Sequence, residues 1–125
     1  MALAKLDSEI TFALSVRDRH ASAEWYQKTL GFALRYHIDE AGWSEMSTFT
    51  PGVILGLGEQ GEPTPGNAVP VFGTPDIDAT RAAMEAGGVR FDGETVEVEG
   101  MVRMATFYDP DGNALMVAQD LSKTH

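Results

Sequence analysis

Two charged residues, Glu45 and Arg103, fall at corresponding places in two stretches of the chain. A carboxylate and a guanidinium on one surface can orient a polar ligand, and arginine binds carboxylate or phosphate groups through paired hydrogen bonds. Strand alternation sets Met46, Val102 and Met104 on the opposite side from this charged pair. We therefore expect Glu45 and Arg103 to line a cavity and contact its ligand. The alternative is that they pair with each other or with solvent.

Two aromatic residues, Trp43 and Phe107, have the same alternation as the charged pair. Aromatic walls bind planar or cationic molecules by stacking and cation–π attraction, although packing in the core or at a dimer interface is the alternative. The formal net charge is -10, from 19 acidic and 9 basic residues. Such a chain attracts cations and repels nucleic acids and anionic membranes. The ligand expected is a small organic molecule, cationic or aromatic.

The motifs of common catalytic sites are missing from the sequence. There is no G-x-S-x-G, no H-E-x-x-H, no phosphate-binding loop and no G-x-G-x-x-G after a strand. The chain has no cysteine, which excludes thiolate nucleophiles, disulfides and cysteine zinc sites. Its three histidines, His20, His37 and His125, lack the spacing of a metal site. No catalytic residue is assigned.

The elements that position these residues follow from alternation and from capping residues. Asp18 can cap a helix that ends at Gly31, and Asp76 can cap a second helix that ends at Gly87. Apolar alternation predicts four strands around each helix. The expected strands are 10–16, 32–38, 43–49 and 53–57 in the first half. In the second half they are 68–72, 95–98 with 89–91 before it, 101–108 and 114–119, with a turn at 109–113.

The two halves repeat one βαβββ order. We therefore expect a single domain, 1–125, made of two tandem modules of about 8–58 and 68–120 and joined by a linker at 58–67. The predicted fold class is α+β, with curled mixed sheets around a cup-shaped cavity. Phe12, Leu14 and Val16 are expected to pack beneath the first helix, which leaves the Thr11 side of that strand facing the cup.

Several motifs, in this order and spacing, resemble the vicinal oxygen chelate superfamily of glyoxalases, bleomycin-resistance proteins and extradiol dioxygenases. The resemblance covers nearly the whole chain, although each motif alone is weak. It is carried by Val16, Asp18, Trp25-Tyr26 and Leu30-Gly31-Phe32 in the first module, by Phe72, Asp76, Ile77 and Asp78 at the start of the second, and by Asp109-Pro110-Asp111-Gly112-Asn113 within Val102–Val117.

The resemblance implies where a catalytic metal would be held. Ligands in metal-dependent members come from the first and fourth strands of each module, positions that here carry Thr11, Leu55, Val69 and Met116. Hydrocarbon side chains offer no donor, and a lone hydroxyl or a thioether binds hard divalent ions poorly. Glu9 shares the alternation of Thr11 but has no partner nearby. We therefore expect no metal and no cofactor, with Leu55, Val69 and Met116 forming an apolar floor.

The expected function is a metal-independent small-molecule-binding protein that resembles the bleomycin-resistance type. One alternative is a glyoxalase- or dioxygenase-like enzyme, a lyase or isomerase. Its site would be an atypical metal centre around Glu9 and Glu45, or a metal-free site using Arg103 and Glu45. Another is a degenerate domain that binds a partner protein. Similar family members form homodimers, so a homodimer is expected. With no signal peptide or apolar span in the sequence, we expect a cytoplasmic location.

Overall fold

The computed structural model describes residues 2–110, 112 and 114–122. The fold is mixed α+β, as predicted, with eight strands and two α-helices among these residues. It divides into two compact units. One is residues 9–70, and the other combines the described part of 71–125 with that of 1–8. No helix in the described part of the chain has the length and apolar character to cross a membrane.

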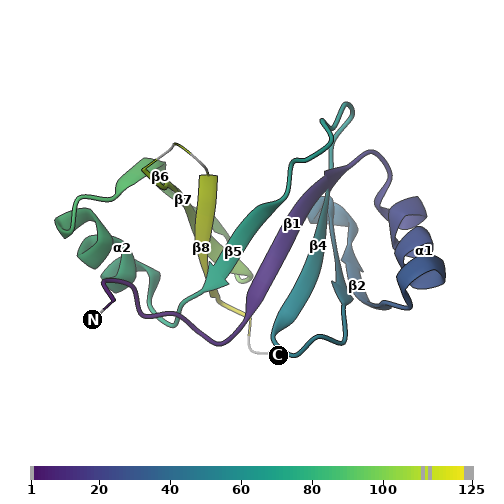
Figure 1. The fold of residues 1–125 in the computed structure, drawn as a ribbon, viewed down its shortest axis with the longest axis horizontal. Helices are drawn as coiled ribbons and strands as arrows, with labels where there is room; N and C mark the ends of the chain where they lie inside the picture. Colours follow the sequence, from purple (N-terminus) through teal and green to yellow (C-terminus); the bar gives the residue numbers. More distant parts are fainter. Residues whose placement is uncertain (1, 111, 113, 123–125) are drawn as a thin grey trace. The chain divides into compact units, whose positions relative to one another are not determined.

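The first unit is one βαβββ module. Strand β1 is parallel to β4, whereas β4 with β3 and β3 with β2 are antiparallel, which gives the order β2-β3-β4-β1. Figure 1 shows α1 beside these strands. The elements are β1 (Ile10–Val16), α1 (Arg19–Leu30), β2 (Ala33–Ile38), a short 3-10 helix η1 (Asp39–Ala41), β3 (Trp43–Ser47) and β4 (Val53–Glu59).

Both ends of α1 are fixed by the residues that the sequence indicated. The Asp18 side chain accepts a hydrogen bond from the Ala21 backbone N–H at 3.1 Å. Gly31 ends the helix with φ 74°, a left-handed conformation that glycine adopts without a Cβ clash. Its N–H donates to the Gln27 carbonyl at 3.1 Å. The capping and ending of this helix were therefore predictable.

The core of the first unit lies between α1 and the sheet. Ala23 of α1 packs with Met46, Leu55 and Leu57, and Leu14 and Val16 contact this cluster. The prediction that the Leu14 side of β1 lies beneath the helix is confirmed. Phe12 shares that side but is 38% exposed, so α1 does not cover the whole sheet.

The second unit repeats the order of the first. Its strands run β5-β8-β7-β6, with β5 parallel to β8 and the other pairs antiparallel. The predicted turn at 109–113 includes residues 111 and 113, which lie outside the described residues. The elements are β5 (Val69–Gly73), α2 (Ile77–Ala86), β6 (Arg90–Val98), β7 (Val102–Tyr108) and β8 (Ala114–Asp120).

The segment before β1 packs against the second unit, which the sequence did not predict. The Asp7 N–H donates to the Gly73 carbonyl at 2.7 Å. The Thr74 hydroxyl donates to the Lys5 carbonyl at 2.7 Å, and Thr74 is only 1% exposed. A Cβ at Gly87 would collide with the Leu3 side chain, so Leu3 lies directly on the end of α2. The N-terminal residues thus stabilise the second module.

Replacing Thr74 with valine should lower the free energy of unfolding by about 1–2 kcal/mol, since the Lys5 carbonyl then loses its shorter hydrogen bond, the one from the buried Thr74 hydroxyl. Urea unfolding measures the change. Thr64→Val, at an exposed position, is the matched control and should leave stability within about 0.5 kcal/mol. An unchanged urea midpoint for Thr74→Val would show that the segment is not anchored in this way.

Candidate functional site

The sheet of the first unit has two faces, and the register assigns each residue to one of them. We call the side of Leu14, Met46 and Leu57, which packs on α1, the helix face. The opposite side is the open face. Glu45 pairs with Gly56, and Gly56 pairs with Ala13, so these residues share the open face. The prediction that Glu45 lies opposite Met46 is confirmed. By this register the open face carries Thr11, Ala13, Trp43, Glu45, Ile54, Gly56 and Gly58.

The indole of Trp43 lies directly against β4. A Cβ added at Gly56 would overlap the indole ring, and one added at Gly58 would lie 3.7 Å from it. The same Cβ at Gly56 would be 3.2 Å from the methyl group of Thr11. The two glycines therefore allow close approach of the ring to the strand. One indole surface packs on the sheet, and no aromatic ring among the described residues stacks on the other.

The carboxylate of Glu45 fixes the orientation of this ring. Its Oε2 accepts a hydrogen bond from Trp43 Nε1 at 3.1 Å, and its Oε1 lies 3.6 Å from Nη1 of Arg35. The Glu45 side chain is 16% exposed and that of Arg35 is 31% exposed. At 3.6 Å the contact with Arg35 is an ion pair and not a hydrogen bond. An approaching cation could therefore replace Arg35 at Oε1.

The positions that the resemblance implies for a metal do not fit a metal ion. Thr11 lies on the open face of β1, and in the second module Val71 pairs with Met116. Val69 has the same alternation along β5 as Val71. Hydroxyl, hydrocarbon and thioether groups provide no set of donors for a hard divalent cation. Within the part of the chain that the structure describes, no three His, Asp or Glu residues form a metal-binding group.

The predicted placement of Leu55 is wrong. Leu55 is 7% exposed and packs with Ala23 and Met46 on the helix face. Its neighbours Ile54 and Gly56 take the open-face positions of β4, where they pair with Thr11 and Ala13. A shift of one residue reverses the face of a strand residue, which accounts for the error. Leu55 therefore lies away from the surface that carries Trp43.

The predicted placement of Arg103 is also wrong. Its guanidinium donates two hydrogen bonds to Asp78 of α2, at 2.9 and 3.0 Å, and its Nε lies 3.4 Å from Glu97. Arg103 thus faces the helix of its own module. Phe107 lies on the same side of β7 as Arg103 and packs against the core of Ile77, Ala105 and Val117. It therefore belongs to the core of its own module, and the prediction that it forms an aromatic wall of the cavity is wrong.

The pair with Arg103 makes acid stability testable. The hydrogen bonds from Arg103 hold the pKa of Asp78 below its usual range. A carboxyl group whose pKa is lowered in the folded state stabilises the protein at pH values above the ordinary pKa of aspartate. This contribution is lost as the pH falls through the lowered pKa of the folded state. Arg103→Ala should return the pKa of Asp78 towards its ordinary value, as measured by NMR titration of the carboxyl carbon. Arg90→Ala, whose guanidinium lies over Tyr108, should leave that pKa unchanged.

A buried arginine that the sequence did not reveal connects α1 to the site. Arg19 is 5% exposed, and its Nη1 donates to the Trp43 carbonyl at 3.1 Å and to the Ser44 hydroxyl at 3.0 Å. Its Nη2 donates to Asp39 at 3.0 Å. Its Nε lies 3.3 Å from the Glu59 carboxylate but out of line for a hydrogen bond. Arg19 therefore fixes the backbone from which the Trp43 side chain projects.

Two histidines complete this network. The His20 and His37 rings stack with centroids 3.8 Å apart, and His37 Nδ1 lies 2.6 Å from the Ser44 hydroxyl. Hydrogen bonds from His20 and then Arg19 hold the pKa of Asp39 below its usual range. Ser44 is fully buried, so its hydroxyl cannot reach a substrate despite its contact with a histidine. The network is structural.

Comparison with known proteins places the chain in a family. The model of the Glyoxalase/Bleomycin resistance protein/Dioxygenase superfamily matches residues 10–117. No curated protein matches the chain in sequence. Many solved structures match its fold, and the three described next are at most 20% identical, which indicates the fold alone.

Three of these structures show the range of the fold. Methylmalonyl-CoA epimerase from Mycobacterium tuberculosis has a TM-score of 0.73 and 18% identity, over 96% of this chain and 93% of that one. A single-residue variant of the Streptomyces coelicolor methylmalonyl-CoA epimerase, in complex with 2-nitronate-propionyl-CoA, has a TM-score of 0.67 and 20% identity. That match covers 97% of this chain and 100% of the epimerase chain. A structure named as NAD-dependent benzaldehyde dehydrogenase from Legionella pneumophila has a TM-score of 0.71 and 16% identity. That match covers 89% of this chain and 98% of the other.

The family match covers most of the chain, and the paired βαβββ modules have the topology that the sequence predicted. The chain belongs to the Glyoxalase/Bleomycin resistance protein/Dioxygenase superfamily, the vicinal oxygen chelate proteins that its sequence resembles.

Proposed function

We propose that the chain is a metal-independent binding protein for a small planar organic cation, which binds on the open face of the first module. The observation that supports this most is the arrangement of Trp43, whose indole packs closely against Gly56 and donates its N–H to Glu45. A fixed aromatic surface next to a carboxylate suits a ligand that is both flat and positively charged. The net charge of -10 favours the approach of such a ligand.

Binding uses groups that the chain already holds in place. The ligand ring stacks on the indole surface that faces away from β4. Its cationic edge takes the place of Arg35 at Glu45 Oε1, since the present separation of 3.6 Å is a weak ion pair. A cation–π contact contributes about 0.5–2 kcal/mol, and a hydrogen bond to a charged group about 1.5–3 kcal/mol. Neither contribution requires a metal ion.

Three tricyclic probes of similar shape test the charge requirement: proflavine is cationic, acridine is uncharged in mildly alkaline buffer, and acridine-9-carboxylate is anionic. A Trp25→Phe background leaves Trp43 as the only tryptophan, because the chain has two. Saturable quenching of Trp43 fluorescence should be strongest with proflavine, weaker with acridine and absent with the anion. Equal quenching by all three probes, or no saturation with proflavine, would contradict the proposal.

Catalysis by Glu45 is the second candidate, because several structures of similar fold are methylmalonyl-CoA epimerases. A carboxylate on the open face can exchange a proton on a carbon next to a carbonyl group. NMR detection of deuterium uptake by methylmalonyl-CoA in D₂O tests this reaction. Exchange that disappears in Glu45→Gln would support an epimerase-type enzyme, whereas a binding protein should give no exchange above the buffer rate.

A further inference from the structure

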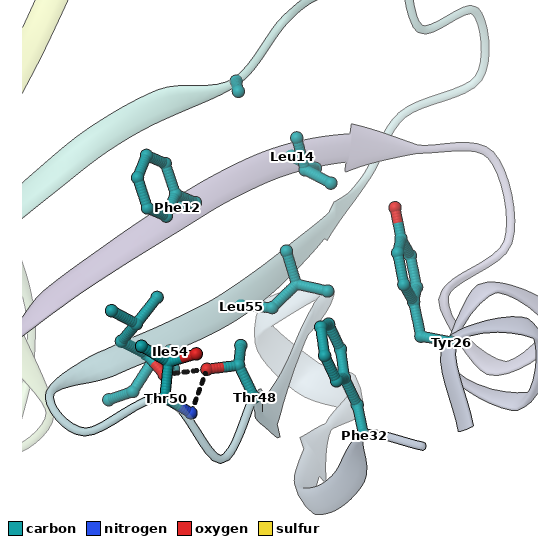
Figure 2. A pocket seen from close by; sticks show the side chains of 10 residues that line it. Phe12, Leu14, Tyr26, Phe32, Thr48, Thr50, Ile54 and Leu55 are labelled. Carbon is teal, nitrogen blue, oxygen red and sulfur yellow. Dashed lines mark hydrogen bonds between the residues drawn. The ribbon is translucent and has the colours of Figure 1, made fainter. Parts of the chain in front are cut away.

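The helix face of the first module carries an open hollow of about 370 Å³. Figure 2 shows Phe12 and Leu14 projecting from β1 and Tyr26 and Phe32 on the other side of Leu55. Its volume falls within the usual range for small-molecule pockets, about 300–1,000 Å³. The lining residues are Phe12, Leu14, Tyr26, Phe32, Thr48, Thr50, Val53, Ile54, Leu55 and Ala68.

The hollow exists because the sheet extends beyond the part that α1 covers. Ala23 of α1 packs over Leu57 and Met46, both fully buried, whereas Phe12 remains 38% exposed. Tyr26 and Phe32 stack with their planes 4° apart and their centroids 6.0 Å apart, forming a flat aromatic wall. The apolar surface of the helix face therefore continues out of the core and into the hollow.

The polar groups around the hollow restrict what it can bind. None of the residues that line it is charged. The Thr48 hydroxyl already donates to the Val53 carbonyl at 2.7 Å and accepts from the Thr50 N–H at 3.2 Å. The described residues offer the Tyr26 hydroxyl no hydrogen-bond partner, so it remains available to a ligand. In a chain with 28 Asp, Glu, Lys and Arg residues (19 acidic plus 9 basic), an uncharged lining selects against ionic ligands.

We propose that this hollow is a second ligand site, for a small uncharged molecule that is mainly apolar and carries one hydrogen-bond acceptor for Tyr26. The Tyr26 and Phe32 wall stacks on a ring or packs against a short aliphatic chain. A second copy of the chain fits less well. A stable protein interface buries about 800 Å² on each partner, more than the ten residues around this hollow supply, since Ile54 and Leu55 are already buried. The hollow is on the helix face, although Ile54 of the open face also lines it, and Trp43 is not among its lining residues. The proposal does not rest on the proposed function.

The uncharged fluorescent probe N-phenyl-1-naphthylamine tests the proposal. It should bind the full chain saturably, with one site per chain and increased emission. Ala68→Phe, which introduces a ring from an exposed position on the lining, should weaken binding about tenfold, equivalent to about 1.4 kcal/mol. Tyr26→Phe removes only the hydroxyl. It should leave binding of this probe within about twofold and weaken a matched ketone, 1-acetonaphthone in competition, by about three- to tenfold.

The controls separate this site from the open face. Trp43→Ala should leave the affinity for N-phenyl-1-naphthylamine unchanged while it weakens proflavine binding, and Ala68→Phe should have the reverse effect. Size-exclusion chromatography, with and without the probe, monitors association. The proposal is overturned if the wild-type chain does not bind the probe, if Ala68→Phe does not weaken probe binding, or if Tyr26→Phe does not weaken 1-acetonaphthone. A different result would show that a second copy of the chain occupies the hollow: the wild-type chain self-associates and does not bind the probe, whereas Ala68→Phe is monomeric and binds it.

Discussion

Trp43→Ala is expected to weaken the binding of proflavine by about 30-fold, because loss of a desolvated cation–π contact corresponds to about 2 kcal/mol. The indole is the flat surface of the open face, and it is oriented by its hydrogen bond to Glu45. Trp43→Phe keeps an aromatic surface and should recover part of the affinity. Isothermal titration calorimetry measures all three proteins, with circular dichroism to show that each is folded.

Neighbouring substitutions separate the roles of shape and charge. Gly56→Ala puts a Cβ where the indole lies, so it should displace Trp43 and weaken binding although no ligand contact is removed directly. Glu45→Gln should weaken proflavine more than acridine. Arg35→Gln should strengthen proflavine binding, since it removes the cation that competes for Glu45. Weaker binding of proflavine by Arg35→Gln would contradict the placement of the ligand charge at this carboxylate.

Arg19→Met should lower the free energy of unfolding by about 2–4 kcal/mol, since the Trp43 carbonyl and the buried Ser44 hydroxyl lose the hydrogen bonds that Arg19 donates. The carboxylates of Asp39 and Glu59 are partly exposed and regain water, which keeps the loss below that of a fully buried ion pair. Urea unfolding, followed by far-UV circular dichroism, measures this change.

The matched control for this prediction is Arg17→Met. The Arg17 side chain is 69% exposed and lies 3.6 Å from Glu62, which is 94% exposed. An exposed ion pair of this kind contributes little, so stability should change by less than about 0.5 kcal/mol. If Arg17→Met and Arg19→Met lowered the free energy of unfolding by similar amounts, the loss of positive charge would explain both effects. The buried hydrogen bonds of Arg19 would then contribute nothing specific to stability.

The strands and helices could be predicted because local residues determine them. Asp18 and Asp76 both cap helices as expected, and each accepts a hydrogen bond from the backbone N–H three residues later. Alternation also placed Trp43 and Glu45 correctly. It failed for Arg103, because apolar residues occur on both faces of β7: Val102 and Met104 on one, and Ala105 and Phe107 on the other. An error of one residue then reverses the face.

Other parts of the site depend on contacts between residues far apart in sequence. Arg19 pairs with Glu59, 40 residues later, and no local pattern indicates that it is buried. The contact of Lys5 with Thr74 spans 69 residues. The hollow beside Tyr26 arises where the sheet extends beyond the part that α1 covers. This depends on how the helix packs on the sheet, which the alternation of residues along a strand does not reveal.

The most direct test of the account is a calorimetric titration of proflavine into metal-free protein, repeated after incubation with a chelator and again after addition of Mn²⁺, Ni²⁺, Zn²⁺ or Fe²⁺. The account predicts one site per chain with the same affinity in every case, because Trp43 and Glu45 supply the binding groups. Affinity that disappears with the chelator and returns with a divalent ion would contradict it.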